Sequence, residues 1–312
     1  MAAVVSFGSV NVDLVARLEA STIKELAARY DWFPAPDETV AVEAIPEAVD
    51  EFVDATFIGG KGSNQAVAAA RGGAVTAFCG RVGTDEGEYG VLDRLADRGV
   101  DVGHVETADT ETGKAYVFVD EAGENRIAIL EGANGTVDAA VAERHRGAVL
   151  DAECLLLQNE IPTATMEALL DAIAGEPDRP TVLFDPAPPA GAGRILAHEA
   201  VDIATPNAYE YEQLRDAIER FDGTVIRKRG SEPAIVEPPG EERISVPPPE
   251  VTPVDTTGAG DVFGGYLAAR LAAGDVLIRA VTVALTAASL ATTEEGAQQA
   301  IPTMAVVEDF MG

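Results

Sequence analysis

The sequence predicts an α/β protein built on a mostly parallel sheet with helices on both faces. Short runs of continuous apolar residues alternate with segments whose apolar residues recur at helical spacing. Strands without polar alternation are buried on both faces, as in a parallel sheet between two helix layers. Two extended regions without helices interrupt the alternation and indicate a second, smaller sheet.

The main sheet and its helices follow from the order of these runs. We expect strands at residues 4–7, 75–79, 154–158, 181–184, 201–204 and 224–226. We expect helices at residues 63–71, 87–98, 139–146, 163–174 and 209–220. Gly72 and Gly73 mark the end of the first helix, because glycine is the usual residue just beyond a helix C-terminus.

The second sheet is expected from residues 39–57 and 115–130. The latter region divides around residues 121–125 into two short apolar strands, and a glycine in the turn is typical of a β-hairpin. We therefore expect one domain over residues 1–312, with lid strands inserted at about 37–58 and 112–131. An unpaired lid edge invites another strand, which favours a homodimer formed through the lid.

Composition limits the function classes. The net charge of −31 would repel nucleic acid and anionic membranes, so neither is an expected partner. The acidic residues are dispersed, which is typical of a halophilic surface in high salt, where repulsion is screened. No apolar run is long enough for a transmembrane helix, and the N-terminus has no basic region of a secretion signal.

The cysteines and histidines offer little sign of metal chemistry. Cys79 and Cys154 lie in apolar runs and are expected to be buried free thiols, which indicates a cytoplasmic protein. His104, His145 and His198 are scattered without the spacing of metal ligands, which disfavours a metalloenzyme.

The strongest functional segment begins at residue 254 with Val-Asp-Thr-Thr-Gly-Ala-Gly-Asp. Gly258, Ala259 and Gly260 are expected at a helix N-terminus, where small residues and unpaired amides can hold an anion. Asp261 falls in the first turn and could deprotonate an attacking hydroxyl. Alternatively, Asp261 only complements the helix dipole. Two glycines at 264–265 lower helix stability by about 1 kcal/mol each, which indicates close approach of a backbone or ligand.

Two further segments carry polar residues suited to a polyhydroxylated ligand. Residues 58–65 (IGGKGSNQ) lack the Gly-Lys-Ser/Thr order of a P-loop, but they present Lys61 and Asn64 at a helix start. Asn11 and Asp13 alternate along a strand and therefore project to the same side. Alternatively, residues 58–65 are only a helix-capping loop, and Asn11 and Asp13 are only the polar end of a strand.

These motifs occur in a recognisable order: GSVNVD, GGKGSNQAVAAA, LQNEIP, DPAP, ATPNAYEYE and VDTTGAGDVFGG. The order resembles that of the ribokinase family of sugar kinases, also called the phosphofructokinase-B family, over nearly the whole chain. The resemblance implies a ribokinase-like three-layer sandwich with a small β-sheet lid. It implies ATP-dependent phosphorylation of a small sugar, with ribose converted to ribose 5-phosphate. It also implies Mg²⁺ and a monovalent cation such as K⁺ as cofactors.

The resemblance also assigns roles to matched positions. Sugar-binding residues would be Asn11, Asp13, Gly60, Lys61, Asn64 and Glu160. Asp261 would be the base, with Gly258, Ala259 and Gly260 as the anion hole. Nucleotide and magnesium placement would involve Asn207, Glu210, Lys228 and Gly230. The cation loop would contain Asp255, Thr257, Ala291 and Gly296.

The alternatives remain open within the resemblance. Asn207 and Glu210 also have the spacing of a capping box, and both roles are compatible. Residues 207–228 form a shorter stretch, and residues 17–59 a longer one, than is typical of ribokinases. A nucleoside or ribose-1-phosphate kinase would need a more aromatic pocket than 5% aromatic residues suggest. A non-catalytic sugar- or nucleotide-sensing protein would not need both Asp261 and the glycine cradle.

Overall fold

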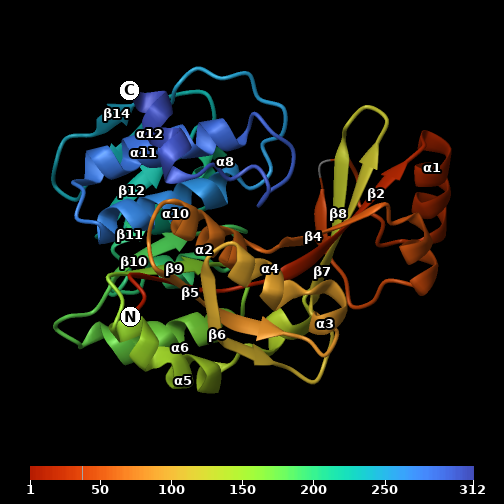
Figure 1. Ribbon diagram of the computed structural model, residues 1–312, viewed down its shortest axis with the longest axis horizontal. Coiled ribbons are helices and arrows are strands. Elements are labelled where there is room, and N and C mark those ends of the chain that lie inside the picture. Colours follow the sequence, from red (N-terminus) through yellow and green to blue (C-terminus); the bar gives the residue numbers. More distant parts are fainter. Residues whose placement is uncertain (37) are drawn as a thin grey trace.

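The central sheet of the computed structural model contains nine strands in the order β14-β13-β12-β11-β10-β9-β1-β5-β6 (Figure 1). Residues 1–36 and 38–312 are described, so the first residue of the predicted lid region, Asp37, lies outside the described residues. The strands are β1 (Val4–Phe7), β5 (Thr76–Val82), β6 (Val100–Thr107), β9 (Cys154–Gln158), β10 (Thr181–Asp185), β11 (Ile203–Ala204), β12 (Thr224–Arg227), β13 (Ala234–Glu237) and β14 (Ile244–Val246). Among the described strands of this sheet, β12 pairs antiparallel with β13 and β13 with β14, and the other neighbours pair parallel.

Two helix layers cover the sheet because consecutive strand residues point to opposite faces. Val4 belongs to one hydrophobic core and Val5 to the other. Helices associated with the Val4 core are α2 (Lys61–Arg71), α3 (Glu86–Tyr89), α4 (Val91–Asp97), α10 (Ala259–Ala272), α11 (Leu277–Ala291) and α12 (Met304–Met311). Helices associated with the Val5 core are α5 (Ala139–Leu150), α6 (Thr163–Ala174), α7 (Gly193–Leu196), α8 (Ala208–Gln213) and α9 (Arg215–Ile218). Figure 1 shows α5 and α6 on the side of the sheet opposite α10 and α11.

A second sheet projects from one side of this sandwich (Figure 1). Its order is β3-β8-β7-β2-β4. The strands are β2 (Asn11–Leu18), β3 (Thr39–Ala41), β4 (Ala55–Gly59), β7 (Gly113–Asp120) and β8 (Asn125–Leu130). The sheet is mixed, since β2 pairs parallel with β7 and antiparallel with β4. Residues 8–10 alone separate β1 of the central sheet from β2 of the smaller one.

The predicted fold class is therefore confirmed: a mostly parallel sheet lies between two helix layers and carries a smaller sheet. Several predicted elements need correction. Helix 87–98 is two helices, α3 and α4, because Gly90 adopts a left-handed φ of 60° between them. Helix 209–220 is likewise divided, into α8 and α9, at Leu214.

The segment before β4 also differs from the extended chain predicted for residues 39–57. Only the short strand β3 and the first residues of β4 are extended, and a 3₁₀ helix, η1 (Glu47–Phe52), lies between them. The preceding helix α1 (Ala20–Arg29) was not predicted either. Leu26 is its only buried residue, and Ile23 and Leu26 are its only large apolar side chains. A second 3₁₀ helix, η2 (Gly132–Thr136), follows the smaller sheet.

The paired glycines of α10 reflect helix packing. A Cβ on Gly265 would lie 2.4 Å from the Gln65 carbonyl oxygen and 2.7 Å from the Ala69 amide nitrogen, both on α2. The close approach predicted for residues 264–265 is therefore made by the backbone of a neighbouring helix. Both cysteines are buried and free, as expected. No helix within the described part of the chain is long and apolar enough to cross a membrane.

Candidate active site

A cavity of about 870 Å³ lies where the parallel strands of the central sheet end. Asp185, the last residue of β10, and Lys228, the first residue after β12, both line it. Carboxyl ends of parallel strands meet at one edge of a sheet, so residues distant in sequence converge there. The N-terminus of α10 lines the same cavity with Gly258, Gly260 and Asp261.

Gly258 starts α10 in a left-handed conformation, with a φ of 75°. The Ala259 amide donates to the Thr256 carbonyl, and the Val262 amide donates to the Gly258 carbonyl. Among the described residues, the amides of Gly260 and Asp261 have no such acceptor. A Cβ on Gly260 would lie 3.2 Å from Lys228 Nζ, so the ammonium group stands beside these amides. Two open amides, a helix dipole and an ammonium group form a site for an anion.

The Asp261 carboxylate is held in place beside this anion site. Its side chain is 4% exposed, and it accepts hydrogen bonds from Asn64 Nδ2 at 2.9 Å and Gln65 Nε2 at 3.3 Å. Burial raises the pKa of Asp261, and the positive charge of Lys61 opposes this increase. The same attraction, with Asp261 as its largest source, raises the pKa of Lys61. Lys61 is therefore charged, and Asp261 is a base stronger than an ordinary aspartate.

The glycine turn before α2 packs against the connection between β1 and β2. Gly60 has a φ of 90°, and a Cβ on it would lie 2.7 Å from Val10 Cα. The Lys61 amide donates to Glu160 Oε2 at 3.0 Å, and Ser9 Oγ donates to the same oxygen. These contacts fix Lys61 and Glu160 beside each other at the start of α2.

Asn11 and Asp13 reach this region from β2 of the smaller sheet. Asn11 pairs with Gly59 in the antiparallel register, and its Oδ1 accepts from Asn134 Nδ2 at 2.8 Å. The Asp13 carboxylate lies against Gly59, because a Cβ there would be 2.0 Å from Asp13 Oδ2. Burial, then the charges of Glu160 and Asp261, raise the pKa of Asp13 to about 7. This end of the site is therefore rich in hydrogen-bond acceptors.

Asn207 and Glu210 form the capping box of α8. The Glu210 amide donates to Asn207 Oδ1 at 2.8 Å, and the Asn207 amide donates to Glu210 Oε2 at 2.7 Å. Both residues also line the cavity, together with Lys228 and Gly230. Burial raises the pKa of Glu210, although Lys228 opposes the change. Both predicted interpretations of the Asn-x-x-Glu motif are therefore compatible with its position.

Asp255 connects the two segments of the predicted cation loop. Its Oδ1 accepts from the Thr257 amide at 2.9 Å, and its Oδ2 accepts from the Gly296 amide at 2.9 Å. Burial acts to raise the pKa of Asp255, but these hydrogen bonds prevail and hold it below its ordinary value. Ala291 ends α11 just before the second segment, and its carbonyl accepts from the Glu294 amide at 3.5 Å. Asp255, Thr257, Ala291 and Gly296 do not line the cavity, although Thr256 and Thr292 of the same loop do.

The structure thus divides the predicted site residues into three neighbouring groups. The cavity itself is lined by Lys61, Asn207, Glu210, Lys228, Gly230, Gly258, Ala259, Gly260 and Asp261. Around Lys61, outside the cavity lining, lie Asn11, Asp13, Gly60, Asn64 and Glu160. The third group is the loop of Asp255, Thr257, Ala291 and Gly296.

Two residues that join these groups were not predicted as site residues. Asp185 is 4% exposed, and its carboxylate lies 3.4 Å from Lys228 Nζ and 3.3 Å from Gln65 Nε2. Gln65 in turn accepts from Gln158 Nε2 at 2.7 Å. The signal for Asp185 was its place in the DPAP motif, directly after a continuous apolar strand. Gln65 carried no comparable signal, since it continues the α2 helix.

Comparisons with known proteins identify the family of this chain. The sequence pattern described as pfkB family carbohydrate kinase matches residues 46–304. A ribokinase of Bacillus subtilis is 33% identical over 88% of this chain and 96% of its own length. A bifunctional ribokinase/ribose-5-phosphate isomerase A of Fructilactobacillus sanfranciscensis is 34% identical over 97% of this chain. The chain spans about half, 55%, of the length of that bifunctional relative.

Solved structures show the same similarity. The ribokinase of Thermotoga maritima superposes with a TM-score of 0.80 at 29% identity, covering 100% of this chain and 99% of its own. The Arabidopsis thaliana ribokinase, solved with ribose and ATP, superposes with a TM-score of 0.77 at 27% identity. The superposition covers 99% of this chain and 98% of the plant chain.

Proposed function

This chain belongs to the pfkB family of carbohydrate kinases, and we propose from its site that it phosphorylates ribose at the primary hydroxyl, with ATP as donor. The observation that carries the proposal is the arrangement at the start of α10. A buried carboxylate, Asp261, stands beside two amides that have no backbone acceptor in the described part of the chain, and Lys228 lies next to them. A base and an anion site in contact are what transfer of a phosphoryl group to a hydroxyl requires.

The proposed reaction is a single displacement. The ribose hydroxyl oxygen forms a bond to the γ-phosphorus, the bond from that phosphorus to the leaving ADP oxygen breaks, and the hydroxyl proton passes to Asp261. Asn64 and Gln65 hold the two carboxylate oxygens by hydrogen bonds and so fix the direction in which Asp261 accepts the proton. The open amides of Gly260 and Asp261 hold the transferred group, since they point where negative charge accumulates.

The sugar is proposed to bind between the two sheets. Asn11 and Asp13 on β2, with Lys61, Asn64 and Glu160 at the start of α2, present carboxylates and amides to its hydroxyls. An ionised carboxylate accepts hydrogen bonds from more than one hydroxyl. The lid proposed at residues 37–58 and 112–131 includes β3, β4, β7 and β8, and would exclude water from the phosphoryl group.

ATP is proposed to occupy the large cavity, with its phosphates towards Lys228 and the α10 N-terminus. The buried carboxylates of Asp185 and Glu210 both line this cavity. One or two carboxylates with substrate phosphates are the usual protein ligands of Mg²⁺, so this donor set fits a hydrated magnesium ion. When bound, Mg²⁺ neutralises charge on the phosphate oxygens. Asn207 and Gly230 would position the nucleotide around it.

A monovalent cation such as K⁺ is proposed for the loop of Asp255 and Thr257 with the segment 291–296. The residues present are compatible with such an ion, because the Asp255 carboxylate bridges both segments and the second segment contributes backbone carbonyls such as that of Ala291. Since this loop immediately precedes Gly258, its order would set the direction of the α10 amides.

Purified enzyme and a substrate panel test the proposed function. ADP release is measured with ribose, ribose 1-phosphate, adenosine and a hexose, in high salt with MgATP. We expect ribose to give the largest kcat/KM. Faster turnover of adenosine or ribose 1-phosphate would assign one of the alternative kinase activities instead. Sugar-dependent thermal stabilisation without ADP release from any substrate would indicate a non-catalytic sensor.

Three broader properties belong to the same proposal. A homodimer formed through strands of the smaller sheet is tested by light scattering at low and high salt. Adaptation to high salt is proposed from the dispersed acidic residues, and is tested by activity and unfolding over a series of KCl concentrations. A cytoplasmic location is proposed because the enzyme would consume ATP, and imaging of a tagged chain tests it.

A further inference from the structure

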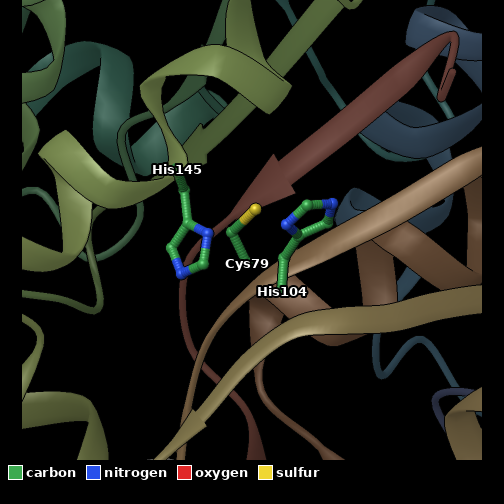
Figure 2. A group of neighbouring side chains, drawn as sticks. All are labelled: Cys79, His104 and His145. Carbon is green, nitrogen blue, oxygen red and sulfur yellow. The ribbon is translucent and has the colours of Figure 1, made fainter.

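Three metal-ligating side chains meet on the face of the central sheet away from α10. Cys79 on β5 and His104 on β6 are direct neighbours in the parallel register, and His145 reaches them from α5 (Figure 2). One ligand atom from each residue lies within 4.8 Å of those of the other two. Figure 2 shows a ring nitrogen of each histidine turned toward the sulfur.

This spacing is close to that of a bound transition metal. In a tetrahedral zinc centre with bonds of about 2.3 Å to sulfur and 2.0–2.1 Å to nitrogen, ligand atoms lie about 3.5 Å apart. The three atoms would therefore draw together by about 1 Å, which rotation of the two rings can supply. The rings are nearly perpendicular, at 86°, with centroids 5.4 Å apart, so neither blocks the other from the space between them.

The surroundings resemble the outer shell of a metal site. His145 Nε2 lies 3.2 Å from Glu106 Oε1 and has no aligned hydrogen-bond partner among the described residues. A ligating histidine almost always has a carboxylate, carbonyl or water at its other ring nitrogen. Glu106 is itself fixed by Arg81 at 3.1 Å and by Arg144 at 2.7 Å.

The charges around the three ligands also permit a cation. Arg81 and Arg144 carry two positive charges, and Glu106 with Asp101, near Cys79, carries two negative ones. The buried sulfur is the only one of the three ligand side chains that is fully shielded, since both histidines are partly exposed. A metal can therefore enter from solvent and retain a water molecule as its fourth ligand.

We propose that Cys79, His104 and His145 bind one zinc-class divalent transition-metal ion, which fastens α5 to β5 and β6. A thiolate and two imidazoles suit such an ion and do not suit Mg²⁺ or Ca²⁺, which take oxygen ligands. The site is separate from the cavity, because α5 covers the other face of the sheet. Its role is structural: the ion joins the sheet edge strand β6 to the helix above it.

The reduced, chelator-treated full chain tests this proposal with Co²⁺ as the probe. We expect one Co²⁺ per chain with the near-ultraviolet charge-transfer band of a cobalt–thiolate bond. Cys79→Ala and His145→Gln should abolish the band. Cys154→Ala and His198→Gln are the matched controls, since each removes the same residue type elsewhere, and both should retain it. Glu106→Gln should weaken binding by about 10- to 100-fold, as loss of an outer partner does.

Two further measurements complete the test. Zn²⁺ should raise the unfolding temperature of the wild type and of His198→Gln but not that of His145→Gln. Neither the added Zn²⁺ nor either substitution should change kcat. Absence of the thiolate band in the wild type would overturn the proposal, even if Co²⁺ binds, because surface carboxylates would then be its ligands. A band that persists in both Cys79→Ala and His145→Gln would also overturn it.

Discussion

Replacement of Asp261 by asparagine tests the proposed base directly. Asparagine has nearly the same size and keeps one acceptor oxygen, but it cannot take a proton from the sugar hydroxyl. Asn64 and Gln65 both donate to the carboxylate, so one of them would face an amide NH₂ group after the change. We expect kcat to fall by about 10² to 10⁴, the usual contribution of a positioned general base. This corresponds to about 2.7 to 5.4 kcal/mol at 1.36 kcal/mol for each factor of ten.

The assay separates catalysis from binding and folding. ADP release at saturating ribose and ATP gives kcat, and calorimetry with ribose alone gives binding, which should remain of the same order. Burial raises the pKa of Asp261 in the folded chain, so its ionised form destabilises the fold above that pKa. The unfolding temperature of Asp261→Asn should therefore rise relative to that of the wild type as the pH increases. The exposed Asp309→Asn serves as a control that leaves kcat unchanged. Near wild-type turnover in Asp261→Asn would refute the assignment and leave only the helix-dipole role.

The remaining predictions concern pH, packing and the cation. The pKa of Asp13 is about 7 in the folded chain, compared with its ordinary value of 3.8. The stability that the protonated carboxyl contributes is therefore fully present below about pH 3.8 and is lost as the pH rises through about 7. Asp13→Asn should raise the unfolding temperature most above pH 7 and not below about 3.8; an equal gain at both extremes would contradict the assigned cause. Gly265→Ala should destabilise by about 1–3 kcal/mol or more in chemical unfolding, because backbone lies 2.4 Å from the new Cβ. Gly264→Ala is its matched control, since only the Gln65 side chain lies near, at 3.4 Å, and equal stability of the two variants would count against the packing argument. Replacing K⁺ by a bulky organic cation at equal ionic strength should lower kcat, and Asp255→Ala should remove the difference; a rate insensitive to K⁺ in the wild type would exclude the cation site.

The fold class could be predicted because local patterns determine it. Continuous apolar runs such as residues 154–158 and 181–184 have one favourable environment, a parallel sheet covered on both faces. Gly258 at the start of α10 was also predictable, since its left-handed conformation matches the residue type. Helix α1 was not predicted, because Ile23 and Leu26 are its only large apolar side chains and a single i, i+3 pair does not distinguish a helix from a loop. Propensity alone is a weak guide when tertiary packing decides.

The site was predictable in its motifs but not in its contacts. Lys61 and Asp261 were identified from their own segments, yet their mutual attraction depends on α2 packing against α10 on the same face of the sheet. Asp185 contacts Lys228 through a similar convergence of strand ends, and no local pattern in either segment indicates this pair. The contacts of the group around Cys79 were even less predictable from the sequence. His104 and His145 are far apart in sequence, and only the β5–β6 register with the position of α5 brings them to the sulfur.

The three residues between β1 and β2 bear on the rate of ATP hydrolysis in the absence of sugar. Ser9 donates a hydrogen bond to Glu160, and both the amide and the carbonyl of Val10 are hydrogen-bonded to Asn134. These hydrogen bonds restrain the link between the two sheets. On the proposed assignment, Asn11 and Asp13 offer acceptors to ribose from β2 of the smaller sheet, and the proton acceptor, Asp261, lies on α10 of the main sandwich. A water molecule satisfies too few of those acceptors to be held beside Asp261 as ribose would be. Wasteful hydrolysis of ATP in the absence of sugar should therefore be slow, without any separate device to prevent it.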